Sequence, residues 1–187
     1  MTNKDITRIA QHLRCIHETA DPRLLCRCLD INIDYLPMGS GNNALKGLIT
    51  RNNRCTTISI NSDQPEKTQT IVLFHEIGHY VLRHHKRKQV CAFHDYGIFD
   101  NASELEDEAN RFVAEYLLDT NKTLQVLREE NDFFRSAALL GVPKEILDYK
   151  MRMLKYYKLL TAECPIYTKR NCMGTIDCSG IENSDYA

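Results

Sequence analysis

The sequence lacks an excess of charge of either sign, because 24 lysines and arginines face 25 aspartates and glutamates, for a formal net charge of -1 at pH 7. Proteins that bind nucleic acid through its phosphates carry a basic surface, so direct nucleic-acid binding is not expected as the main activity. No apolar run approaches the roughly 20 residues that span a bilayer, which argues against a membrane helix. Residues 1–10 also lack the apolar stretch of a signal peptide, and we therefore expect a cytoplasmic protein.

The chain also lacks the usual signs of a disulfide framework, although it contains 8 cysteines. Without an export signal, free thiols are expected rather than disulfides. Three cysteines lie within apolar patterns and are expected to act as small core residues: Cys15, Cys26 and Cys55. The cysteines after residue 163 lack the C-x-x-C pair of a structural zinc site. We therefore expect residues 163–187 to form a flexible, reduced tail.

The spacing of apolar residues predicts a mixed but mainly helical chain. Helices are expected over residues 5–18, 21–29, 65–85, 103–117, 121–130, 132–140 and 144–161, and strands over 31–35, 47–50 and 55–60. Apolar residues lie nearly all round the helix at 65–85, so this helix is expected to be central and buried. The predicted fold class is α+β, a mainly helical domain with a small N-terminal β-sheet packed beside that central helix.

The most informative motif is His75-Glu76-Ile77-Gly78-His79, within this central helix. Histidines four residues apart lie on one face of a helix, so both imidazoles can reach one metal ion. Glu76 is placed to act on a water molecule bound to that ion, as in the H-E-x-x-H zinc peptidases. The alternative is a hydrogen-bonded histidine pair in a buried helix. Glu76 and the acidic helix beyond favour the metal site.

A catalytic zinc takes three protein ligands and leaves one position for water. The helix at 103–117 offers four carboxylates as the third ligand: Glu104, Glu106, Asp107 and Glu108. Glu106, Asn110 and Val113 share one face of this helix, so Asn110 could hydrogen-bond a metal ligand from behind. Spacing alone does not choose between Glu104, Glu106 and Glu108. The alternative for each is a solvated acidic residue at a helix start, which the helix dipole also favours.

Other histidines near the motif have less specific signals. His84 and His85 are expected to cap the end of the central helix or to lie in solvent. His94 and Tyr96 lie in a predicted loop, where they are candidate donors of hydrogen bonds to an oxyanion. The predicted strand over 55–60 immediately precedes the motif helix and is a candidate edge for pairing with an extended peptide substrate.

Two stretches together resemble the ImmA/IrrE family of bacterial and phage metallopeptidases. Residues 70–82 read T-I-V-L-F-H-E-I-G-H-Y-V-L, and residues 106–118 read E-D-E-A-N-R-F-V-A-E-Y-L-L. The second is similar to the family pattern E-x-x-A-N-x-F-x-A-x-x-L-L. The resemblance covers residues 20–120, including the strands before the motif. The chain departs from the family at Val113, where a small residue is commoner, and at Asp119-Thr120, where Met-Pro is common.

The resemblance implies a zinc metallopeptidase domain over residues 1–120, with its core motifs in 70–118. It implies that Glu106 is the third ligand beside His75 and His79, and that Glu76 is the general base. A histidine pair with a carboxylate suits Zn²⁺ best, and Mn²⁺ or Fe²⁺ can occupy the same ligands. We expect a helical subdomain over 121–162, in which residues 137–147 have either a helix-turn-helix character or that of an ordinary helical hairpin.

The family also implies a protein substrate, because its members typically cleave or inactivate a helix-turn-helix repressor and so relieve repression of mobile-element or stress genes. The first hypothesis is therefore a zinc-dependent endopeptidase that acts on such a repressor. A second is a regulatory module that binds a repressor without proteolysis and holds a structural metal. A third, which the charge balance disfavours, is a DNA-binding protein with an incidental motif.

Overall fold

The computed structural model describes residues 1–41, 44–52, 55–84 and 104–161. The chain divides into two compact units, residues 1–113 and residues 114–187. The helices are α1 Asn3–His17, α2 Pro22–Cys28, α3 Glu66–Val81, α4 Glu104–Leu117, α5 Thr120–Glu129, α6 Phe133–Leu140 and α7 Lys144–Tyr156. The strands are β1 Ile31–Leu36, β2 Gly47–Asn52 and β3 Cys55–Asn61. The predicted α+β class, mainly helical with a small sheet, is confirmed.

The three strands form one sheet in the order β1-β3-β2. β1 runs parallel to β3, with Ile31 opposite Thr56, and β2 runs antiparallel to it, with Gly47 opposite Ile60. The prediction that residues 55–60 form an edge strand is therefore wrong. β3 has a partner on each side, whereas β1 and β2 are the outer strands of the described sheet. Chain order alone does not reveal this, because β2 precedes β3 and yet pairs on the side away from β1.

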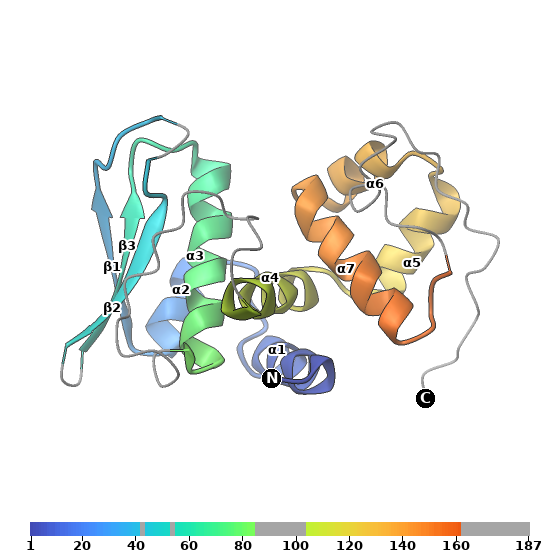
Figure 1. Ribbon diagram of the computed structural model, residues 1–187, viewed down its shortest axis with the longest axis horizontal. Coiled ribbons are helices and arrows are strands. Elements are labelled where there is room, and N and C mark those ends of the chain that lie inside the picture. The colour runs from blue at the N-terminus through green and yellow to red at the C-terminus, as the bar shows by residue number, and fades with distance from the viewer. Residues whose placement is uncertain (42–43, 53–54, 85–103, 162–187) are drawn as a thin grey trace. The chain divides into compact units, whose positions relative to one another are not determined.

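The helix with the histidine motif packs beside this sheet, as Figure 1 shows for α3 and the strands. Ile58 and Ile60 of β3 are fully buried, and every residue from Ile71 to His79 is also buried. The backbone of β2 lies very close to α3, since a β-carbon built on Gly47 would be 2.5 Å from Cγ1 of Val72. Burial of the apolar residues of α3 therefore holds the motif helix against the sheet.

Local signals set the helix boundaries. Thr2 and Asp5 form a capping box at the start of α1, and Asp21 caps α2, whose first residue is Pro22. α3 ends at Val81, four residues before the predicted end. Arg83 then adopts a left-handed backbone conformation with φ 59°, which turns the chain away from the helix axis. None of the described helices is long and apolar enough to cross a membrane.

The second unit contains α5, α6 and α7. α6 begins after the N-cap Asp132 and ends at Leu140, and the C-cap Gly141 has the left-handed conformation (φ 71°) favoured at helix ends. Phe133 and Ile146 are fully buried. Lys150, also buried, donates hydrogen bonds to Glu115 at 2.9 Å and to the Thr120 hydroxyl at 3.1 Å. The helix-turn-helix interpretation of residues 137–147 stays a prediction.

Candidate metal centre

Three of the residues predicted as metal ligands converge in the first unit. His75 and His79 project from adjacent turns of α3, and Glu106 reaches them from the first turn of α4. His75 Nε2 lies 2.9 Å from His79 Nε2 and 2.9 Å from Glu106 Oε2. His79 Nε2 lies 3.3 Å from the same carboxylate oxygen. The three atoms therefore form a compact triangle that could hold a metal ion.

The chemistry of this donor set fits a cation. Ligands of a tetrahedral zinc ion lie about 2.0–2.2 Å from the metal, so they are separated from one another by roughly 3.3 Å. The separations of 2.9 to 3.3 Å between the three atoms are close to that value. Both histidines are 1 % exposed, whereas Glu106 is partly accessible. A His₂–carboxylate set with one accessible side is the arrangement of a catalytic rather than a closed structural zinc site.

The electrostatics of the cluster also suit a metal. Burial lowers the pKa of His79 to about 4, although Glu106 acts in the opposite direction. Burial opposes ionisation of Glu106, but hydrogen bonds to His75 and His79 and their electrostatic attraction outweigh it, holding the pKa of that carboxyl well below its usual range. At neutral pH the cluster therefore holds an ionised carboxylate beside a neutral imidazole. These are the protonation states that metal coordination requires.

Asn110 orients one of the histidines from behind. Its side-chain Oδ1 lies 2.9 Å from Nδ1 of His75, and both side chains are buried. Because the amide oxygen can only accept, His75 Nδ1 carries the proton and Nε2 presents its lone pair to the cluster. That lone pair faces an ionised Glu106 oxygen at 2.9 Å. Two such acceptors are stabilised at this distance only by a proton or a metal cation between them.

A second chain of contacts reaches His79 and was not found from the sequence. His84 Nδ1 lies 2.7 Å from His79 Nδ1, and His84 Nε2 lies 3.0 Å from Oε2 of Glu108. His84 and Glu108 are both fully buried. The prediction that His84 caps the helix or lies in solvent is therefore wrong. His84 follows the left-handed residue Arg83 beyond the end of α3, so no helical periodicity could place it beside His79.

The other predicted site residues divide into three groups. Glu76 is fully buried within α3, directly after His75. Glu104 is exposed at the start of α4, and Glu108 contacts His84 rather than the histidine pair. The structure thus brings only Glu106, of the three alternatives left open by spacing, into the group with His75 and His79. The remaining predicted residues, His85, His94 and Tyr96, lie outside the described residues.

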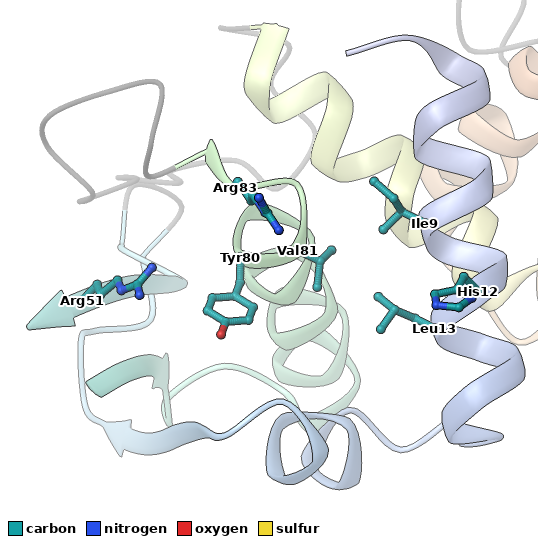
Figure 2. Close-up of a pocket in the computed structure, with 7 residues that line it drawn as sticks. All are labelled: Ile9, His12, Leu13, Arg51, Tyr80, Val81 and Arg83. Atoms are coloured by element: carbon teal, nitrogen blue, oxygen red, sulfur yellow. The ribbon is translucent and has the colours of Figure 1, made fainter. Parts of the chain in front are cut away.

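A pocket of about 420 Å³ opens beside α3 within the same unit. Figure 2 shows that its lining residues come from α1, from β2, and from the end of α3 and the turn that follows it. They are Ile9, His12, Leu13, Arg51, Tyr80, Val81 and Arg83. Tyr80 directly follows the motif residue His79, and Arg51 comes from the outer strand β2. Helix α3 therefore contributes residues to both the pocket and the metal cluster, and the outer strand β2 also lines the pocket.

The chain is similar to one known protein family. No curated protein sequence matches the chain significantly. A family model does match: residues 26–152 fit the model of the peptidase M78 family, described as the IrrE N-terminal-like domain. The match includes β1 to β3, the histidine motif and α4, and extends into α7. It supports a metallopeptidase-type role for the protein, in which the group formed by His75, His79 and Glu106 could bind a metal. The chain therefore belongs to the IrrE N-terminal-like peptidase M78 family.

Proposed function

We propose that this protein is a zinc-dependent endopeptidase that cleaves or inactivates a helix-turn-helix transcriptional repressor in the cytoplasm. The observation that carries the proposal is the convergence of His75 Nε2, His79 Nε2 and Glu106 Oε2 within 3.3 Å of one another. Membership of a peptidase family supports hydrolysis of peptide bonds as the reaction. Zn²⁺ is the proposed metal, and Mn²⁺ or Fe²⁺ suits the same donors.

In this proposal His75, His79 and Glu106 hold the metal, and Glu76 is the general base. A bound zinc ion would supply Lewis-acid activation of a water molecule and of the scissile carbonyl. Glu76 takes the proton from the attacking water and later returns it to the leaving amine. Its full burial supports this role, because exclusion of bulk water would strengthen its electrostatic interaction with the reacting groups. Asn110 keeps the His75 ring in the required tautomer.

The substrate would bind as an extended peptide beside the sheet. β3 has partners on both sides, so an added strand must pair with an outer strand of the described sheet. β2 is the better candidate because it packs directly on α3, where Gly47 approaches Val72. A peptide on β2 would also lie near the pocket lined by Arg51 and Tyr80 (Figure 2). That pocket has the apolar walls and the few polar groups that seat a side chain.

A repressor is the proposed substrate because of the family resemblance carried by the histidine motif and the residue 106–118 stretch. The net charge of -1 supports a role on the protein rather than on its DNA. The alternative function is a non-proteolytic module that binds a repressor and holds a structural metal.

The decisive experiment compares Glu76→Gln with the wild-type protein. The purified proteins are assayed for zinc by mass spectrometry and incubated with repressors encoded beside the gene, whose fragments are identified by mass. The variant is expected to retain one metal per chain and to lose cleavage by about 10²- to 10⁴-fold, the usual contribution of a general base. Glu66→Gln is the matched control, because Glu66 lies on the same helix with its side chain 82 % exposed.

Two results would overturn the proposal. Full cleavage by the Glu76→Gln variant would show that Glu76 is not the general base. Relief of repression in cells by Glu76→Gln, at the wild-type level and without repressor fragments, would favour the binding module. Loss of zinc in a His75→Ala variant should accompany loss of cleavage if the same site performs both tasks.

A further inference from the structure

We propose that Glu108 and His84 are positioning residues that hold His79 in the tautomer and orientation needed for metal binding. This inference rests on the proposed metal role of His79. It adds Glu108 and His84 to the site formed by His75, His79 and Glu106. The two added side chains and His79 form a buried series of contacts. The contacts come from two elements: Glu108 lies on α4, and His84 lies just beyond the end of α3.

The Glu108 carboxylate determines the direction of the hydrogen bonds among these three side chains. Glu108 Oε2 lies 3.0 Å from His84 Nε2, and a carboxylate can only accept, so the proton sits on His84 Nε2. In a neutral imidazole the other nitrogen is then an acceptor. His84 Nδ1 therefore accepts from His79 Nδ1, 2.7 Å away. His79 Nε2 is left without a proton and points its lone pair toward Glu106 and His75.

The two ligand histidines are thus oriented in different ways. His75 donates to the neutral amide of Asn110, whereas His79 donates through His84 to a carboxylate. A carboxylate behind an imidazole makes the opposite ring nitrogen a stronger electron donor, and such outer contacts typically change metal affinity by about 10- to 100-fold. We therefore expect the negative charge of Glu108 to strengthen the bond from His79 to zinc.

The burial of the pair supports a role beyond filling space. His84 and Glu108 are both fully buried, as is His79 to within 1 %. Burying an imidazole and a carboxylate costs more free energy than burying apolar side chains of the same volume. The α-ammonium group of Met1 also contacts Glu108, through the second carboxylate oxygen, and offsets part of that cost.

Four variants test the proposal by the zinc dissociation constant, measured by competition with a chromogenic chelator. Glu108→Gln keeps an acceptor for His84 but removes the charge, and we expect about 10-fold weaker zinc binding. His84→Leu removes the chain, with about 100-fold weaker binding expected. His84→Gln keeps an amide acceptor for His79 and should restore part of the loss. His17→Gln, at the last residue of α1 and outside the pocket, is the control and should bind zinc like the wild type.

Two measurements separate positioning from a general loss of folding. Each metal-free variant is first melted, and zinc binding is compared below its melting temperature. The ¹⁵N shifts of the imidazoles are then recorded in the zinc-bound wild-type protein, which needs no substitution. We expect protons on His79 Nδ1 and His84 Nε2. A proton on His84 Nδ1, or equal zinc affinity in the wild type, Glu108→Gln and His84→Leu, would overturn the inference.

Failure of this inference is distinct from failure of the proposed peptidase function. Zinc bound with the expected tautomers, in a protein that cleaves no repressor, would support the positioning chain and overturn the peptidase. Loss of cleavage in Glu76→Gln, together with unchanged zinc affinity in Glu108→Gln and His84→Leu, would support the peptidase function and overturn the positioning role of Glu108 and His84.

Discussion

Gly78 lies directly against the backbone of Ala109, where α3 meets α4. A β-carbon built on Gly78 would lie 3.3 Å from the Ala109 carbonyl oxygen and 3.4 Å from its Cα. It would also lie 3.0 Å from the ring of Phe112, which is fully buried. The absence of a side chain at Gly78 therefore allows the close approach that brings Glu106 to His75 and His79.

Gly78→Ala should weaken metal binding without unfolding the helix. Alanine favours a helix over glycine by about 1 kcal/mol, but here its methyl group must push α4 away from α3. We expect at least about 10-fold weaker zinc binding with unchanged helical circular dichroism. Gly41→Ala is the matched control, because a β-carbon there would meet nothing within 4 Å. Wild-type zinc affinity in Gly78→Ala would show that the helices do not need this contact.

Glu106→Gln should weaken zinc binding strongly and Glu104→Gln should leave it nearly unchanged, although both residues lie in the first turn of α4. Glu106 lies 2.9 Å from His75 and 3.3 Å from His79, whereas Glu104 is exposed. Removing the charged ligand should weaken zinc binding by more than about 100-fold, the upper range for an outer contact. Titration with a zinc-selective chelator measures the zinc dissociation constant of both variants. Similar losses in the two would indicate a general electrostatic effect of the acidic helix start.

Cys26 and Cys28 should differ sharply in reactivity, although both belong to α2. Burial raises the pKa of the Cys26 thiol to about 12, so at pH 8 only on the order of one thiol in ten thousand is ionised. Cys28 is exposed. Brief treatment of the folded protein with iodoacetamide at pH 8, followed by peptide mass spectrometry, should label Cys28 and leave Cys26 unmodified. Equal labelling would mean that α2 opens on the time scale of the reaction.

Asp148→Asn should stabilise the protein at neutral pH. Burial raises the pKa of Asp148 above its ordinary value, although Arg152 favours the charged form. A folded pKa above the unfolded value stabilises the protein at low pH, and this contribution is lost as pH rises through the folded pKa. The variant should therefore melt at a higher temperature than the wild type at pH 7, and the difference should shrink as the pH falls below the ordinary Asp pKa of 3.8. A lower melting temperature at pH 7 would show that the ion pair with Arg152 outweighs burial.

The sequence predicted those features that depend on local pattern. Helical spacing located α3 and its motif, and the family resemblance chose Glu106 from three carboxylates that spacing left equivalent. Features that depend on packing between distant segments were missed. Nothing local distinguishes Cys26, which is buried, from Cys15 and Cys55, which are exposed contrary to prediction.

Two further differences have the same physical origin. The central position of β3 is set by which strand pairs on each side, and pairing partners are not encoded in the alternation of one strand. The burial of His84 depends on the left-handed turn at Arg83, which no glycine or asparagine signals. The predicted boundary between the peptidase domain and the helical subdomain at residue 120 stays a prediction.

The separation of the metal ligands along the chain has a consequence for biosynthesis. Glu106 lies 31 positions after His75, so the two histidines emerge from the ribosome before the carboxylate does. A nascent chain that ends before α4 offers a cation only two imidazoles, and a two-ligand site binds weakly. Because long-range contacts form late in folding, tight binding of the proposed zinc ion would follow the docking of α4 on α3. Stoichiometric zinc would therefore mark chains whose first unit has finished folding.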